Sequence, residues 1–385
     1  SMATFKSKGK VSYYEKKLVE GMVKRGYSKD FAHRVFKQIE GFGSYGFPES
    51  HAASFALLVY ASSWIKYYYP DVFATALLNS MPMGFYQPAQ IVIDAQKHGV
   101  VVRGVDVNYS FWDHTLEEKD GTYRALRLGF RQVKGMDQNN IEKLIEGRQT
   151  RVYQNIQQLV DAGVTQAALE KLADADAFRS LGLDRRQALW EVSALADLPF
   201  GLFAGQPSNS AFEIPVHLPK MGQGEHVAQD YALLGLSLKA HPVSFVRNRL
   251  SPKGVVENRQ LPELPDGSWV RIAGLILVRQ RPGTASGICF LTLEDETGIA
   301  NIVVFKKLFD QYRRQIVGSK LLTIEGKIQK EGQVIHVIMY RCYDETELLK
   351  ELGRDDEVKE PIVATKSKKK VGVQMEIFPK GRNFH

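Results

Sequence analysis

Apolar residues along the chain change their spacing twice. Over residues 12–110 they recur every three or four positions, which is typical of helices with one buried side. A helix is predicted over residues 28–40, with Ser28 as its N-cap and Gly41 as the residue that ends it. A second, strongly apolar helix is predicted over residues 50–69 and is expected to lie in a protein core.

The central part combines short strands and short helices. Within residues 111–200, "YRALRLGFRQV" alternates like a strand pair, and four short helical patterns follow it. Residues 201–262 are richer in Pro and Gly and are predicted to form a linker with one helix of its own.

Between residues 267 and 343 the apolar period is two. The strand-like segments are "SWVRIAGLILVRQR", "GICFLTLEDE", "GIANIVVF", "KLLTIEGKIQKE" and "QVIHVIMYRC", and "DETG" makes a tight turn between the second and third. A helical segment, "KKLFDQYRRQI", separates the third and fourth. Five strands with a helix at that place are the order of an OB barrel, so we expect an α+β multidomain chain with a five-stranded OB β-barrel near its end.

Charge and cysteine content narrow the class of protein. The 385 residues include 51 Lys and Arg against 43 Asp and Glu, a net charge of +8, which favours a polyanionic partner such as nucleic acid. Cys289 and Cys342 offer neither a disulfide framework nor a CxxC metal clamp, which fits a reducing cytoplasm. The start shows no signal peptide, and the longest apolar stretch, residues 51–65, is too short to span a bilayer.

A glycine-rich segment precedes the apolar helix and is a candidate phosphate site. In "GFGSYGFPESHAASFALLVY" the glycines would let a backbone approach closely, and Ser50 and His51 stand where the helix begins. Unpaired N–H groups at a helix start attract anions, so this end could hold a phosphate. The alternative is that Ser50 only caps the helix and His51 only packs.

Two further segments are candidates for binding a nucleic-acid backbone. "VKGMDQNNIEKLI" resembles a helix-hairpin-helix turn that aims the N–H groups of Lys134, Gly135 and Met136 at a phosphate, although Asp137 stands where a second glycine is usual. Arg185 and Arg186 are expected to contact the backbone from a helix start, or else to be solvated side chains of an ordinary helical connection.

The barrel adds basic and aromatic side chains. The candidates for single-strand binding are Arg271, Arg279, Gln280, Arg281, Phe290 and Lys306, accompanied by Lys307 and Phe305. The aromatic residues could instead belong to the barrel core, and OB barrels also bind proteins and sugars.

No complete active site is recognisable. The nearest paired carboxylates, Asp174 and Asp176, are expected to cap a helix, and no P-loop, HExxH, GxSxG or strand-borne GxGxxG occurs. We therefore predict no catalytic residues, metal ligands or cofactor in this chain.

The segment "GFGSYGFPESHAASFALLVYASSWIK" closely resembles the C-family bacterial DNA polymerases, the polymerase III alpha-subunit family. The "PESHA" form resembles the error-prone branch that accompanies a mutagenic translesion cassette. Further similar passages are "MATFKSKGK", "LLNSMPMGFYQPAQIVIDA", "DVNYSFWD", "LRLGFRQVKGM", "DYALLGLSLKAHPV", "LEDETGIANIVVF" and "GRNFH". The resemblance covers nearly the whole chain and corresponds to the family's C-terminal half.

The resemblance implies a division into domains and a role for each. The expected parts are the C-terminal portion of the fingers (1–110), a clamp-side helix-hairpin-helix domain (111–200), a structured linker (201–262), an OB domain (263–345) and a tail (346–385). Gly43, Tyr45, Ser50 and His51 would lie near the incoming triphosphate or the template. The catalytic aspartates and their magnesium would belong to an upstream palm, so this chain alone is expected to bind DNA without polymerising it.

The resemblance also implies partners. The expected DNA ligands are a primed template and a single strand, and the expected protein partners are a sliding clamp, a polymerase-like accessory protein of the cassette, or both. The family's clamp-binding position reads "ADLPFGLFAG" here, with Leu202 and Phe203 but no leading glutamine. The tail motif "QMEIF" offers Gln374, Met375, Ile377 and Phe378 instead. A free-standing nucleic-acid-binding or protein-binding module without polymerase activity stays open as the alternative.

Overall fold

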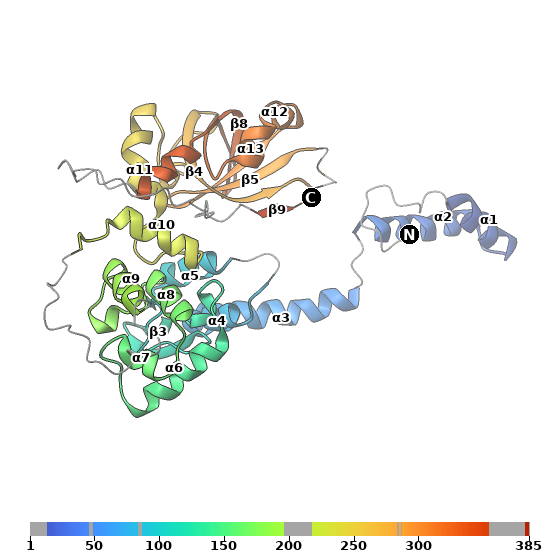
Figure 1. Cartoon of the computed structure of the whole chain (residues 1–385). Coiled ribbons are helices and arrows are strands. Elements are labelled where there is room, and N and C mark those ends of the chain that lie inside the picture. Colours follow the sequence, from blue (N-terminus) through green and yellow to red (C-terminus); the bar gives the residue numbers. More distant parts are fainter. Residues whose placement is uncertain are drawn as a thin grey trace, which may run out of the picture.

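The computed structural model describes residues 14–45, 49–83, 87–195, 218–282, 285, 287–353 and 382–384. Figure 1 shows a β-barrel and a mainly helical unit lying one against the other, with helix α10 between them and three N-terminal helices extending away. Within the described ranges, no helix combines the length and the apolar character needed to cross a membrane.

The first two helices form a small core of their own. Helices α1 (Glu15–Lys24) and α2 (Lys29–Tyr45) pack through Val19, Ala32 and Phe36. Helix α2 continues past Gly41, so the prediction that Gly41 ends it is wrong, and the first part of the glycine-rich segment is helical. A glycine inside a helix lowers the stability of the helix by only about 1 kcal/mol relative to alanine, so a helix can continue through it.

Helix α3 (Glu49–Tyr68) is apolar on all sides, yet its side chains lie largely exposed. Leu57 and Tyr60 are each 71% exposed. The helix was expected to lie in a protein core, but the described residues of this chain do not form a core around it. A helix that is apolar all round normally lies inside a larger core.

One hydrophobic core joins the following elements into a single unit (the hairpin unit). These are α4 (Pro70–Asn79), α5 (Pro88–Lys97), β1 (Val102–Arg103), β2 (Thr115–Asp120), β3 (Tyr123–Arg127), η2 (Phe130–Gln132), α6 (Gln138–Thr150), α7 (Gln157–Asp161), α8 (Gln166–Asp174), η3 (Arg179–Leu181) and α9 (Arg185–Ala194). The strands form a sheet in the order β1-β3-β2. Because Leu78 and Ile91 belong to this core, α4 and α5 pack with the hairpin unit rather than with α1 and α2.

Two helices link the hairpin unit to the barrel. The backbone N–H of Lys134 donates to the carbonyl of Leu233 at the end of α10 (Gln223–Leu233), at 2.9 Å. Helix α11 (Pro242–Leu250) and η8 (Thr346–Gly353) pack on the outside of the barrel, where Ala273, Leu275 and Leu321 form a core with them. The short turns η6 (Ser251–Lys253) and η7 (Asn258–Gln260) lead into the first strand.

The barrel confirms the five-stranded OB prediction. Its elements are β4 (Trp269–Gln280), β5 (Cys289–Glu294), β6 (Ile299–Val304), α12 (Lys306–Gln311), α13 (Arg313–Gly318), β7 (Leu321–Glu331) and β8 (Val334–Asp344). The pairing order β5-β6-β8-β7-β4 is closed by β4 with β5. The inward positions are apolar, including Ile272, Leu291 and Ile324, and the single helix expected between the third and fourth strands is two short ones.

A short strand near the end of the chain extends the barrel sheet. Strand β9 (Arg382–Phe384) pairs in parallel with β4, with Val278 opposite Arg382 and Gln280 opposite Phe384. It occupies the β4 edge beyond Leu275, where the pairing of β4 with β7 stops.

Candidate nucleic-acid interface

The first hairpin turn exposes a lysine and a glycine. Lys134 and Gly135 are exposed, Met136 is buried, and Gly135 has a positive φ of 70°, which glycine adopts without strain. The ammonium group of Lys171 donates to the Gly135 carbonyl and brings a second cation to the turn. The Lys134 N–H is engaged by Leu233, so of the three predicted residues Lys134 offers its side chain rather than its amide.

Asp137 keeps a negative charge beside this turn. Its carboxylate accepts hydrogen bonds from the side chains of Asn139 at 3.4 Å and Asn140 at 2.9 Å, in the first turn of α6. These neutral donors leave the charge uncompensated, so Asp137 repels a phosphate from the side of the turn where a second glycine is usual.

A second hairpin joins α7 to α8 and was missed in the sequence. Its turn contains Gly163, with a φ of 85°. The amides of Gly163 and Val164 donate to carbonyls at the end of α7, and the amide of Thr165 donates to Asn140 at 2.9 Å. These N–H groups are satisfied inside the protein. The signal in the sequence was a lone glycine between two short apolar helical patterns.

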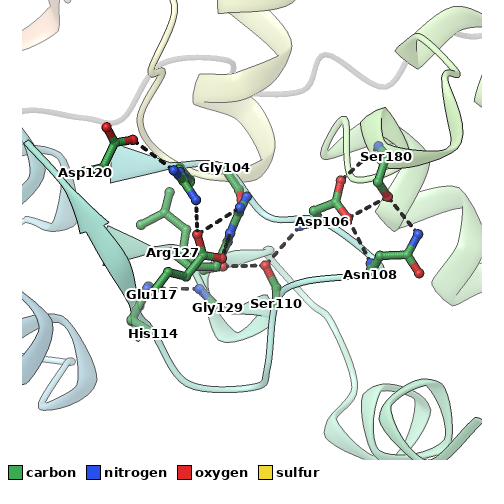
Figure 2. A network of polar contacts seen from close by, with 12 residues as sticks. Gly104, Asp106, Asn108, Ser110, His114, Glu117, Asp120, Arg127, Gly129 and Ser180 are labelled. Carbon is green, nitrogen blue, oxygen red and sulfur yellow. Dashed lines mark hydrogen bonds and ion pairs between the residues drawn. The ribbon is translucent and has the colours of Figure 1, made fainter. Parts of the chain in front are cut away.

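A polar network joins the strands and loops of residues 103–129 to one another and to Ser180 (Figure 2). The buried carboxylate of Asp106 accepts from the backbone N–H of Asn108 at 2.8 Å and from the Ser180 hydroxyl at 2.7 Å. Glu117 pairs with Arg127 at 2.7 Å and with Arg103 at 2.6 Å. The network therefore ties the 106–110 loop to η3 and holds the sheet in register.

His114 belongs to the same region and is buried. Its Nδ1 accepts a hydrogen bond from the Gly129 N–H at 3.1 Å, which requires that nitrogen to be unprotonated. Burial, reinforced by the nearby Arg131 charge, lowers the pKa of His114 to about 4. His114 is therefore a neutral structural side chain at physiological pH.

The two predicted arginines at the start of α9 have internal partners. Arg185 is fully buried, donates to the His226 carbonyl at 2.9 Å and forms an ion pair with Asp230. Arg186 is partly exposed and pairs with Glu225 at 2.7 Å. Arg185 is not accessible to a nucleic acid, which corrects the prediction for that residue.

Two predicted barrel arginines are also engaged inside the protein. Arg279 is 7% exposed and donates to the carbonyls of Ile316, at 2.6 Å, and Ser319, at the end of α13. Burial lowers the pKa of its guanidinium, while the two carbonyls accept hydrogen bonds from that group. Arg271 pairs with Glu325. Arg279 is therefore a structural residue, contrary to the prediction, and the charge of Arg271 is compensated.

The other predicted barrel residues lie at the surface, beside a group of cations. Gln280 is exposed and Phe290 partly exposed, and Arg281 lies over the Phe309 ring, 4.6 Å from its centroid. Four exposed cations on α12 and α13 form no ion pair with any residue in the described ranges: Lys306, Lys307, Arg313 and Arg314. Phe305, 47% exposed, precedes them. Uncompensated cations beside an aromatic ring suit a single-stranded nucleic acid.

Other predicted sites lie where the structure gives little or no detail. Gly43 and Tyr45 are in the last part of α2, and Ser50 and His51 are at the start of α3, but their side chains lie outside the described residues. The predicted clamp-binding residues Leu202, Phe203, Gln374, Met375, Ile377 and Phe378 also lie outside them.

The described side chains include no group of three or more His, Cys, Asp or Glu placed to hold a metal ion. The cations described above stand in two places. Lys134 and Lys171 stand at a hairpin turn, and a second set of cations stands on the barrel helices.

Comparisons with known proteins agree with this division. A family model described as a helix-hairpin-helix motif matches residues 99–188, and one described as an OB-fold nucleic acid binding domain matches residues 270–344.

Three relatives match the chain over most or all of its length. Error-prone DNA polymerase 1 of Rhizobium meliloti (strain 1021) is 46% identical over 439 residues, which cover 100% of this chain and 39% of that protein. Error-prone DNA polymerase of Sinorhizobium medicae (strain WSM419) is 47% identical with the same coverage, 100% and 39%. Error-prone DNA polymerase 2 of Agrobacterium fabrum (strain C58 / ATCC 33970) is 51% identical over 353 residues, 89% of this chain and 32% of that protein. The chain thus spans about two fifths of the length of the first relatives, 39% in each case.

Proposed function

Since the chain belongs to the family of C-family error-prone DNA polymerases, we propose that it is the DNA-binding and recruitment half of such an enzyme. The observation that carries the proposal is identity of 46% over 100% of the chain to a protein named as an error-prone DNA polymerase. The parent protein would then catalyse template-directed transfer of nucleotides to a primer.

The chemistry of the described surface supports DNA as the ligand. The Lys134 and Lys171 ammonium groups at the hairpin turn can each pair with a phosphate, and so can the four exposed cations of α12 and α13. Contacts of this kind do not depend on base sequence, as a polymerase that copies any template requires.

The bond-making step is assigned to the rest of the parent. We place its catalytic carboxylates, and the Mg²⁺ that they would hold, on an upstream palm, because phosphoryl transfer uses clustered carboxylates with bound metal ions. Residues 41–51, at the junction of α2 and α3, would belong to the fingers and lie near the incoming nucleotide or the template.

Damage tolerance and recruitment complete the proposal. The parent would act in translesion synthesis in the bacterial cytoplasm, where it would be brought to DNA by a sliding clamp, a polymerase-like accessory protein, or both. The candidate contacts are Leu202 with Phe203 and the "QMEIF" tail, since paired apolar anchors dock in hydrophobic grooves.

Primer extension by the parent and by this chain tests the proposal. We expect the parent to extend a primer on an undamaged template and on one carrying an abasic site, and to require Mg²⁺ for both. The 385-residue chain should bind the same primed DNA without extending it. A well-folded parent that binds DNA but extends neither primer would favour the alternative, a binding module without polymerase activity.

A further inference from the structure

Two exposed aromatic rings meet on the outside of the barrel, away from the residues predicted from the sequence. Trp269 opens β4 and is 61% exposed, and Tyr340 on β8 is 44% exposed. Their ring centroids lie 4.8 Å apart at an interplanar angle of 54°. The ammonium group of Lys327, on the intervening strand β7, lies 5.3 Å from the centroid of the Trp269 ring. We call these three residues the Trp269 platform.

A β-bulge presents the platform. Glu325 pairs with Arg341 and the next residue, Gly326, pairs with Met339, so Tyr340 is an extra residue in β8. In a regular strand neighbouring side chains point to opposite faces, but here Tyr340 and Arg341 are both exposed. A Cβ on Gly326 would lie 2.4 Å from the Ile338 carbonyl oxygen, so this position requires glycine.

The platform continues toward the cations of α12. Strands β6 and β8 run in parallel with Val303 opposite Ile338, so Phe305 and Tyr340 each follow two residues beyond a paired position. Phe305 is 47% exposed and leads directly into Lys306 and Lys307. By this register Phe305, at the end of β6, lies at the same level along the barrel as Tyr340 on β8.

The charge beside the Trp269 platform is positive. Neither Lys327 nor Arg341 forms an ion pair with a carboxylate among the described residues. Glu325, the acidic residue closest in register, is engaged by Arg271 and is 3.4 Å from the Tyr343 hydroxyl. Two uncompensated cations beside stacked rings match a ligand that has flat aromatic groups and phosphates.

The opposite face of the barrel lacks this combination. The outward positions of β5 and β6 carry one partly exposed aromatic residue, Phe290, but no basic one; the others are Thr292, Ile299, Asn301 and Val303. At one end of that face the Glu294 carboxylate is buried against the Gln90 amide of the hairpin unit, at 3.3 Å. This is the face that OB folds commonly use for oligonucleotides, and here it offers few groups for a phosphate backbone.

We propose that a single strand of DNA crosses the outer face of β4, β7 and β8. Its bases would stack on Trp269 and Tyr340, and its phosphates would pair with Lys327 and Arg341. The inference rests on the proposed function, because that function supplies DNA as the ligand. It assigns the single strand to a different face of the barrel from the Gln280 and Phe290 positions predicted from the sequence.

The assignment can be tested by titrating a fluorescein-labelled oligo-dT with the 385-residue chain. An oligonucleotide of about 12 nucleotides is long enough for one OB fold. Trp269→Ala combined with Tyr340→Ala should weaken binding at least tenfold, because each base–aromatic stack contributes severalfold or more. Lys327→Gln should reduce the slope of log K against log salt by about 0.7, the value for one phosphate on a single strand. Trp269→Phe should keep the affinity and lose most of the tryptophan quenching that DNA causes.

Trp190→Ala is the matched control, because Trp190 is also exposed, at 54%, but lies on α9 of the hairpin unit. The variants should melt at the wild-type temperature, since the removed side chains are exposed. The assignment is overturned if the folded Trp269 and Tyr340 double variant titrates like wild type. Loss of binding on Thr292→Ala with Asn301→Ala instead would move the strand to the β5–β6 face. A wild-type chain that binds no oligonucleotide would count against the proposed function itself.

Discussion

Arg185 and Asp230 form an ion pair that joins α9 to α10, and their side chains are 0% and 3% exposed. Lys239 donates to the same carboxylate at 2.9 Å, so Asp230 receives two cations. A buried charge is tolerated only when it is paired and hydrogen-bonded. The pair therefore fixes the contact between the hairpin unit and the linking helix.

We expect Arg185→Ala to lower the free energy of unfolding by about 3–5 kcal/mol, because it leaves the buried Asp230 carboxylate without its main partner. Urea unfolding followed by circular dichroism measures the change. The neighbouring Arg186→Ala, which removes a partly exposed pair with Glu225, should cost about 1 kcal/mol or less. Equal losses for the two variants would contradict the burial of Arg185.

Arg279 and Arg281 should respond differently to substitution, although they are two residues apart. Arg279→Ala leaves the Ile316 and Ser319 carbonyls without a donor and should cost about 3 kcal/mol of stability. Arg281→Ala should leave the melting temperature nearly unchanged and weaken binding of a single strand, because Arg281 lies over Phe309 of α12 and adds to the cations of that helix. Thermal melts and oligonucleotide titrations of both single variants separate the two roles; a double variant would hide the difference.

The cations of α12 should set part of the salt dependence of DNA binding. Replacing Lys306 and Lys307 by Gln should reduce the slope of log K against log salt by about 1.4, since each phosphate contact on a single strand contributes about 0.7. Lys253→Gln removes a lysine that is already paired with Glu345 at 2.6 Å and is the control. A slope that does not change in the double variant would remove α12 from the DNA path.

His114 should make the fold less stable in mild acid. Its pKa is about 4 in the folded protein against about 6.5 when unfolded, so between pH 6.5 and pH 4 the unfolded chain takes up the proton more readily than the folded one. The stability that neutral His114 contributes to the fold is fully present above about pH 6.5. It is lost as the pH falls toward 4, and the free energy of unfolding then decreases by up to about 1.4 kcal/mol per pH unit. His114→Gln keeps an acceptor for the Gly129 N–H but cannot titrate.

The measurement is the melting temperature at several pH values between about 7.5 and about 4.5. This range includes the pH at which an unperturbed histidine titrates. Wild type should lose more stability across this window than His114→Gln does. His98→Gln, a variant of an exposed histidine, should follow wild type. Parallel curves for all three proteins would show that folding does not lower the pKa of His114.

The barrel was predictable from the sequence because its strands alternate apolar and polar residues against a single core. The accessibility of its arginines was not. A register shift between Ile276 and Val278 changes which side chains of β4 face inward, and it turns Arg279 toward the end of α13. Nothing in the local pattern shows such a bulge, and the same limit concealed the exposed pair of Tyr340 and Arg341.

In the hairpin unit, local signals predicted the turns but not their partners. Asp184 caps α9 by accepting from the Gln187 N–H at 2.9 Å, as its position at a helix start suggests. The burial of Arg185 depends on Asp230, which the chain brings alongside only after the linker. Likewise the glycines of residues 41–45 predict a loop locally, although this stretch continues α2.

Strand β9 has a practical consequence for work with this protein. It covers backbone groups of β4 at Val278–Gln280 that would otherwise form an open sheet edge, and open edges invite pairing between molecules. A purification tag fused directly after β9 would have to leave from a hydrogen-bonded strand. Fusion at the other terminus leaves this edge covered, and deletion of the last four residues should promote self-association.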